Sequence, residues 1–304
     1  MSSRKAGSSR RKSAVELIPY DPAFDDAVGL IDASELQAIR YNEDVIKETV
    51  HLALFDRQCI GCGYLALGTV NDGILTVCCE FGVNSRDPWS IEAANALLDA
   101  LKADYRRLAP AFGHFPSRLT VWAKEGSAVG DFAAAHGFLA GRRMTSFRND
   151  LSRAKKEDSP LPDAWIKELD VTDPAVMKAY IAANGRGFGF PDSEKGLLFR
   201  VRHWKARVFA FVKDGQILSA VTVWPRKNRS FATEDIFCIP EYRRMHLTET
   251  LIRHVLTEGQ EKGYASAGLC AFSHNTAAVK LYEKCGYEKE FDLIEYYYDQ
   301  AAAG

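Results

Sequence analysis

Apolar and polar residues alternate in a way that predicts a strand followed by a helix in the second half of the chain. The strand covers residues 231–239, which are rich in apolar and aromatic side chains, and Pro240 stops it. Aliphatic residues then recur at helical spacing from Leu247 to Leu256, and Gly263 ends the run. The segment therefore reads as a strand, a tight turn and an amphipathic helix.

A second strand and helix are expected directly afterwards. Residues 265–272 form a short apolar run, and Asn275 stands where its side chain can cap a helix. Tyr282 lies on the apolar face of that predicted helix, and Gly286 can close it. We therefore expect a helix between Asn275 and Gly286, followed by another strand.

The remaining pattern predicts a similar order of elements in both halves of the chain. The first half predicts strands at 15–18, 51–55, 59–67, 74–83, 119–123 and 144–151, and helices at 23–39, from 87 onward and at 128–135. The second half adds strands at 165–169, 208–212, 217–224 and 287–298, and helices at 175–183 and 197–204. This recurrence indicates an internal duplication.

Domain boundaries are expected where composition shifts. Residues 1–13 are Ser-rich and basic and predict a disordered tail. The first domain is expected over 14–152 and the second over 164–304. Residues 153–163, charged and containing prolines, would link them. The order of strands and helices predicts the fold class α/β (α+β), with two tandem domains.

Composition excludes several classes of protein. The 304 residues carry a formal net charge of −1, so no global field favours nucleic acid or an anionic membrane as a partner. No apolar run reaches the roughly 20 residues needed to span a bilayer. No hydrophobic stretch follows the basic N-terminus, which argues against a secretion signal. Seven cysteines at irregular spacing favour reduced thiols and a cytoplasmic location.

Two motifs in the second half resemble those of the GNAT superfamily of acyl-CoA-dependent N-acyltransferases. The first is the Pro-Glu-Tyr-Arg turn at 240–243, and the second is the helix from Asn275 to Tyr287, which contains Tyr-Glu-Lys-Cys-Gly-Tyr. The resemblance covers both halves and implies two tandem GNAT-like domains, the first of them degenerate. Each would be a mixed, mostly antiparallel twisted sheet flanked by helices. It also implies acetyl-CoA as co-substrate and an amine as acceptor, with no metal.

The turn at 243–248 has a physical reason to bind phosphate. A helix N-terminus leaves backbone N–H groups unpaired and carries a positive partial charge. The family places the CoA pyrophosphate there, which makes the six residues of the turn candidates: Arg243, Arg244, Met245, His246, Leu247 and Thr248. His246 and Thr248 stand where the family usually has small residues. An ordinary amphipathic helix with a basic entry turn is the alternative.

The resemblance also assigns roles to strand and helix residues. Tyr282 would protonate the leaving thiolate, and Glu234 would take the proton of the amine. The pantetheine arm would lie along the strand at Phe237, Cys238 and Ile239. Ordinary alternatives are a core tyrosine and a salt-bridged surface glutamate. Strand alternation places Asp235 on the face opposite Glu234.

Asn275 would serve as a helix cap and as a CoA contact, and the loop expected at 185–190 would form a wall of the acceptor site. By contrast, Cys59 and Cys62 form a CxxC without a second pair, which does not indicate a metal or redox site.

The corresponding turn of the first half is less suited to acyl-CoA. Pro88 has no N–H to donate, and Asp87 puts a negative charge where a phosphate would sit. Trp89 is bulky where the backbone must come close, and Ala133 stands at the place of Tyr282. The first domain is therefore expected to be structural or to shape the substrate site.

The sequence thus predicts an N-acetyltransferase acting on a primary amine of a small molecule or peptide, with the site in the second domain. A homodimer is left open. One alternative is a non-catalytic binding or sensor module with decayed sites, which the departures at His246 and Thr248 motivate. Another is an acyltransferase with a different acyl donor.

Overall fold

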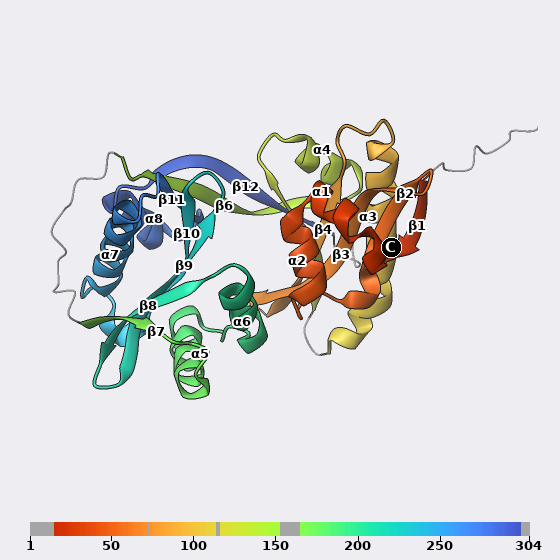
Figure 1. Cartoon of the computed structure of the whole chain (residues 1–304). Coiled ribbons are helices and arrows are strands. Elements are labelled where there is room, and N and C mark those ends of the chain that lie inside the picture. Colours follow the sequence, from red (N-terminus) through yellow and green to blue (C-terminus); the bar gives the residue numbers. More distant parts are fainter. Residues whose placement is uncertain (1–14, 72, 114–115, 153–164, 299–304) are drawn as a thin grey trace, which may run out of the picture. The chain divides into compact units, whose positions relative to one another are not determined.

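The computed structural model describes residues 15–71, 73–113, 116–152 and 165–298 (Figure 1). The predicted tail at 1–13 and linker at 153–163 lie outside these residues. Two compact units share the described chain. Unit 1 holds the described residues up to Tyr41 and then Val45–Leu119, and unit 2 holds Asn42–Asp44 and the described residues from Thr120 onward. This division falls before the predicted linker, and the predicted domain boundaries stay a prediction.

Unit 1 combines four strands with helices. Its strands are β1 (Val15–Pro19), β2 (His51–Phe55), β3 (Gln58–Asn71) and β4 (Ile74–Val83). Its helices are α1 (Asp25–Ile31), α2 (Ala33–Tyr41) and α3 (Ser90–Leu108), with short 3₁₀ turns at Pro22–Phe24, Lys47–Thr49 and Ala109–Phe112. The four strands pair antiparallel in chain order. Buried aliphatic residues under α1 and α2, such as Val28 and Leu52, form one part of its core.

Unit 2 holds the remaining elements. Its strands are β6 (Leu139–Asp150), β7 (Ile166–Leu169), β8 (Arg207–Lys213), β9 (Gln216–Arg226), β10 (Ser230–Cys238), β11 (Ser266–Phe272) and β12 (Glu288–Tyr298), with most of β5 (Ser117–Lys124). Its helices are α4 (Ala128–Ala135), α5 (Pro174–Phe188), α6 (Glu194–His203), α7 (Leu247–Glu261) and α8 (Thr276–Lys284), and Pro240–Tyr242 is a 3₁₀ turn.

The sheet of unit 2 runs in the order β5-β12-β6-β11-β10-β9-β8-β7. Only β10 and β11 pair in parallel among the pairs with described registers, so the sheet is mostly antiparallel, as the sequence predicted. The expected last strand of the first half, β6, lies between β11 and β12. It pairs with β11 in an unbroken register from Ser266↔Asp150 to Phe272↔Met144. Strand β6 therefore belongs to the sheet that carries the second-half motifs.

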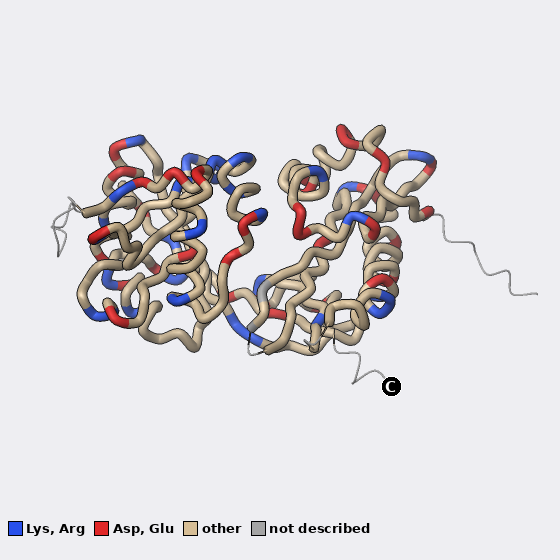
Figure 2. Tube along the Cα trace, turned by 90° about the horizontal axis from the view of Figure 1, so that it is seen from below, with Lys and Arg blue, Asp and Glu red and all other residues tan. Residues whose placement is uncertain are grey.

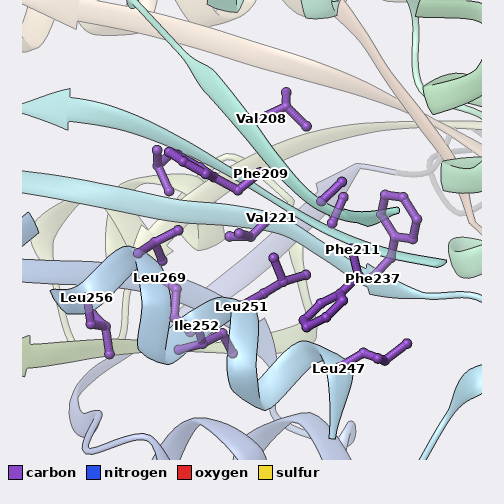
Figure 3. Packing of buried hydrophobic residues seen from close by; sticks show 14 of the residues in the cluster. Val208, Phe209, Phe211, Val221, Phe237, Leu247, Leu251, Ile252, Leu256 and Leu269 are labelled. Atoms are coloured by element: carbon purple, nitrogen blue, oxygen red, sulfur yellow. The ribbon is translucent and has the colours of Figure 1, made fainter. Parts of the chain in front are cut away.

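Helices cover the two faces of this sheet. On one face, α7 packs so closely that a Cβ at Gly259 would lie 2.3 Å from Phe231 Cε1. On the other face, the Tyr180 hydroxyl of α5 lies 3.2 Å from Thr222 Oγ1 of β9. The α7 face is strongly apolar, and Figure 3 shows its packing, including Leu247, Leu251, Ile252 and Leu256. Burial of this stripe holds α7 in place.

Besides shifts in the ends of several elements, two predicted segments differ from the structure in type. The helix expected at 23–39 is broken at Asp32, whose backbone is extended and whose carboxylate accepts the Ser34 N–H at 2.8 Å. A short polar side chain of this kind competes with helix hydrogen bonds. The loop expected at 185–190 is also wrong in part, because α5 continues to Phe188 and ends at Gly189 with φ of 89°.

Charged residues of both signs are interspersed along the chain in each unit (Figure 2). This agrees with the near-zero net charge. Within the described residues, no helix is both long enough and apolar enough to cross a membrane.

Candidate functional site

The centre of the candidate site is the place where β10 and β11 stop pairing. Their parallel register holds only for Ser230↔Ser266, Phe231↔Ala267 and Ala232↔Gly268. Both strands continue beyond these pairs, β10 to Cys238 and β11 to Phe272. The facing edges of the two strands are therefore not bonded to each other there. We call this place the splay, meaning residues 233–238 of β10 and 269–272 of β11.

A β-bulge distorts β10 at the splay. Glu234 pairs with Thr222 of β9, but the next pair is Phe237 with Ala220, so two residues of β10 stand opposite one of β9. Asp235 in this bulge has φ of 49°, a left-handed conformation. The predicted alternation of Glu234 and Asp235 is therefore wrong. Thr222 lies on the α5 face, so its partner Glu234 does too, and Asp235 faces Arg200 of α6.

Glu234 spans the splay with its side chain. Its carboxylate accepts a hydrogen bond from the Cys270 backbone N–H of β11 and lies 3.3 Å from Arg226 Nη2. Burial, with Asp235 adding to it, raises the pKa of Glu234 to about 8 against the opposing effects of Arg226 and Cys270. A carboxyl group with this pKa can accept a proton near neutral pH.

Tyr282 of α8 lies close enough to the splay for the charge of Glu234 to affect it. It is buried, and burial followed by the charge of Glu234 raises its pKa above the ordinary tyrosine value. Its ring packs edge-on against Phe147 and Tyr287. Among the described residues, none forms a hydrogen bond with its hydroxyl. The hydroxyl is thus protonated and not committed to another residue of the described chain.

The backbone of β10 offers one edge to the splay. The Ile239 N–H donates to Leu218 O of β9 at 2.9 Å, so Ile239 does not have that N–H free. Alternation then directs the N–H and C=O of Cys238 away from β9. The Cys238 carbonyl accepts a hydrogen bond from Arg243 Nε at 3.3 Å. The Phe237 side chain is buried under α5 and serves packing.

The two arginines in the turn after β10 have different roles. Arg243 donates from Nη2 to Gly187 O at 2.9 Å, which ties the end of α5 to the turn. Arg244 has φ of 66°, is exposed, and has no hydrogen-bond or ion-pair partner in the described part of the chain. Met245 is also exposed, at 53%. Arg244 is therefore the cation of this turn that a ligand could engage.

The start of α7 is open for an anion. His246 precedes the helix with φ of 59°, and no side chain caps the first turn. Glycine adopts a positive φ without steric cost, which explains why a glycine is favoured at such a position. Leu247 is buried, and Thr248 Oγ1 lies 3.1 Å from Ser219 Oγ of β9. These two side chains anchor the helix, while its first backbone N–H groups lack intrahelical partners.

Glu249 stabilises this end of α7 through contacts with three basic side chains. Its carboxylate is buried and contacts Lys284 Nζ at 2.8 Å, His246 Nδ1 at 3.0 Å and Arg253 Nη2 at 3.2 Å. Burial alone would raise the pKa of Glu249, but these three hydrogen bonds lower it from 4.5 to about 2. The contact with Lys284 joins α7 to the end of α8.

We expect Glu249→Gln to destabilise the protein in a pH-dependent way. A carboxyl whose pKa is lowered by folding stabilises the folded state above its unfolded pKa of 4.5, and this is lost as pH falls toward about 2. The loss in the variant should reach at most about 3 kcal/mol near neutral pH. Urea unfolding at about pH 6 and about pH 3 should show a smaller difference between wild type and variant at the lower pH. A constant difference would contradict the assigned ion network.

Comparison with known proteins supports the reading of this region. Residues 174–287 match the family model described as the Acetyltransferase (GNAT) family. The chain carries a GNAT-family domain. This match confirms the predicted resemblance to the GNAT superfamily. No curated protein matches the sequence.

Solved structures show that the fold likeness extends over nearly the whole chain. A tandem GNAT protein from the clavulanic acid biosynthesis pathway is 15% identical, with a TM-score of 0.66 over 93% of this chain and 98% of that chain. A GCN5-related N-acetyltransferase from Sphaerobacter thermophilus is 14% identical, with a TM-score of 0.63 over 94% and 95%. A protein from Pyrococcus horikoshii, described as a possible acetyltransferase, is 12% identical, with a TM-score of 0.60 over 98% and 94%. The tandem GNAT fold predicted from the sequence is confirmed.

Asn275 of the GNAT domain and Asp87 of the first half have structural roles. Asn275 caps α8 by accepting the Ala278 N–H at 3.2 Å, while its contact with CoA stays a prediction. In the corresponding turn of the first half, Asp87 accepts the Trp89 N–H at 2.8 Å, and Trp89 stacks on Phe55. Asp87 thus bonds the residue that precedes α3, while Trp89 itself makes no side-chain cap for that helix.

Sequence reasoning missed residues that reach the GNAT site from other elements. Arg200 pairs with both Asp192 and Asp235, and the Cys270 N–H donates to Glu234. No periodic signal marks them, because each contact joins distant segments. Among the described residues, no group of three or more His, Cys, Asp or Glu side chains could hold a metal ion.

Proposed function

We propose that this protein is an acetyl-CoA-dependent N-acetyltransferase whose working site lies in the GNAT domain. The acceptor would be a primary amine of a small molecule or peptide. Seven free cysteines agree with a reducing compartment, and we place the protein in the cytoplasm.

The pyrophosphate of CoA would bind at the start of α7. The uncapped first turn supplies N–H donors and the positive end of the helix dipole. Arg244 would add a full charge, while Arg243 holds the turn against α5 through Gly187. Met245 and His246 would border the phosphates. Glycine at the His246 position would widen the site, but the N–H donors do not depend on it.

The pantetheine arm would enter the splay. The backbone of Cys238 faces it, and an extended ligand can bond there in the manner of an added strand. The thioester would then come to rest between Glu234 and Tyr282. This is the observation that carries the proposal: pairing of β10 and β11 ends after three residues, and an acid and a base flank the place where it ends.

The chemical step follows from these positions. The neutral amine nitrogen would attack the thioester carbonyl, a C–N bond would form, and the C–S bond would break. The amine proton would pass to the Glu234 carboxylate, and the Tyr282 hydroxyl would protonate the thiolate. Holding amine and thioester together supplies much of the acceleration.

Calorimetric titration of acetyl-CoA into the full chain tests this site. We expect about one equivalent to bind, and Arg244→Ala to weaken binding roughly tenfold because one charge-assisted contact is lost. Arg86→Ala, at the matching turn of the first half, serves as the control and should bind as wild type does.

Other results would redirect the assignment. Two equivalents would show that the first half also binds, despite Asp87 and Pro88. Absence of heat with acetyl-CoA and with longer acyl-CoAs would contradict the transferase and favour a binding module with a decayed site. Binding of a longer acyl-CoA alone would change only the donor.

A further inference from the structure

We propose that Asp235 selects acceptors that carry a second ammonium group close to the amine that is acetylated. Short diamines are the simplest acceptors of this class. The inference rests on the proposed function, since it concerns the acceptor side of the same site. Four features of the described residues support it.

The first feature is the position of Asp235. The bulge in β10 turns its side chain to the face covered by α5 and α6, which is also the face of Glu234. The Cα atoms of adjacent residues lie about 3.8 Å apart. A molecule whose amine meets Glu234 therefore has Asp235 within reach of a short chain.

The second feature is that the Asp235 carboxylate lacks a hydrogen-bond donor. Its Oδ2 is buried and has no hydrogen-bond partner, and the nearest cation, Arg200 Nη2, lies 3.4 Å away. No other described group donates to this carboxylate. The side chain as a whole is 33% exposed through atoms other than Oδ2, and a ligand would approach the carboxylate from that side. Carboxylates held inside a protein are ordinarily hydrogen-bonded.

The third feature is the balance of charge. Arg200 forms a close ion pair with Asp192 in addition to its longer contact with Asp235. The charge of Asp44 also acts on Arg200, so this one guanidinium faces three carboxylates, and its Nε has no partner among the described residues. Arg200 and the three carboxylates together carry an excess negative charge. A cation would neutralise that charge, whereas a second carboxylate on the acceptor would be repelled.

The fourth feature is an aromatic surface beside these groups. Phe237, which shares the face with Glu234 and Asp235, meets the ring of Phe188 at 5.9 Å, and Phe188 stacks on Phe190 at 6.0 Å. Phe188 is 41% exposed. Aromatic faces accommodate both methylene chains and ammonium groups. This surface suits the carbon chain between two amines.

Asp235→Asn provides the test. Asn adopts positive φ as readily as Asp, so the bulge is retained while the charge is removed. Initial rates of thiol release from acetyl-CoA are measured with 1,4-diaminobutane and with 1-aminobutane. We expect KM for the diamine to rise between about tenfold and a hundredfold, the value of one charge-assisted hydrogen bond. KM for the monoamine should stay within about twofold of wild type, while kcat for both amines should change by the same factor because Asp235 also raises the pKa of Glu234.

Asp214→Asn is the matched control, because Asp214 also has positive φ, 50°, but lies in the exposed turn between β8 and β9. It should leave both KM values unchanged. Equal effects of Asp235→Asn on the KM values of both amines, or no effect on either KM, would overturn the proposal. So would the absence of a preference for the diamine in the wild type.

Calorimetric binding of 1,4-diaminobutane to the protein saturated with CoA separates this inference from the proposed function. Binding that depends on Asp235, without thiol release, would contradict acetyl transfer but keep the cation site. Thiol release with monoamines, without diamine binding, would contradict the cation site but keep acetyl transfer.

Discussion

Replacing Glu234 by Gln is expected to lower kcat/KM for acetyl transfer by about 10²- to 10⁴-fold, the usual contribution of a general base. Glutamine keeps the size of the side chain and can still accept a hydrogen bond from the Cys270 N–H. It cannot take a proton from the amine. The loss would therefore report the chemistry of the carboxylate and not a change of packing.

The same variant should lose one feature of the pH profile. Because burial raises the pKa of Glu234 to about 8, the carboxyl is mostly protonated at pH 7 and becomes an effective base as pH rises. We expect kcat/KM of the wild type to increase with pH up to about 8 and then to approach a limit set by the amine. In Glu234→Gln this rise should be absent.

Arg226→Ala is an informative control for that profile. Arg226 lowers the pKa of Glu234 from the side of β9. Its removal should move the rise in kcat/KM to higher pH while acetyl-CoA binding stays unchanged. If the profile of Glu234→Gln matched that of the wild type, Glu234 would not be the base.

Tyr282→Phe is expected to lower kcat by about 10²- to 10⁴-fold with little change in acetyl-CoA affinity. The variant removes only the hydroxyl, and no described residue depends on that hydroxyl for a hydrogen bond. The aromatic contacts with Phe147 and Tyr287 remain possible. A proton donor is needed because the departing thiolate would otherwise leave as an anion in a buried place.

A comparison of two acyl donors distinguishes a proton-donating role of Tyr282 from a structural role. A thioester with a more acidic thiol needs less protonation as it leaves, so the variant should lose less rate with it. Unfolding midpoints measured in parallel should agree between variant and wild type. An equal loss with both donors, together with lowered stability, would identify Tyr282 as a core residue.

Local patterns predicted most elements of the fold. Strands β2 and β4 and helix α4 have the predicted bounds, because turn residues and apolar periodicity both act within a few residues. The cap of α8 by Asn275 was also predicted, since the side chain needs only its own N–H neighbours. The extension of α5 past Gly185 and Gly187 was not predicted, because packing against Phe237 offsets the low helix propensity of glycine.

The candidate site could be predicted only in part. Glu234 and Tyr282 were indicated by resemblance, but the pKa of Glu234 depends on burial and on Arg226, Asp235 and Cys270. Arg243 was predicted as a phosphate ligand, yet its side chain binds the carbonyls of Cys238 and Gly187. The contacts of Arg243 depend on where α5 ends in the folded protein, and the sequence of the turn alone does not predict that position.

The sequence alone determined the two-half organisation, the helix start after Pro240 and the motif residues of the GNAT domain. The first two depend on periodicity, capping and composition, which are local, and the motif residues were identified by their resemblance to the GNAT superfamily. The tertiary structure decided that β6 lies between β11 and β12, that β10 and β11 separate after three pairs, and that a bulge turns Asp235 toward Arg200. Each of these is a choice of partner across the sheet, and backbone pairing between distant strands leaves no trace in the local pattern.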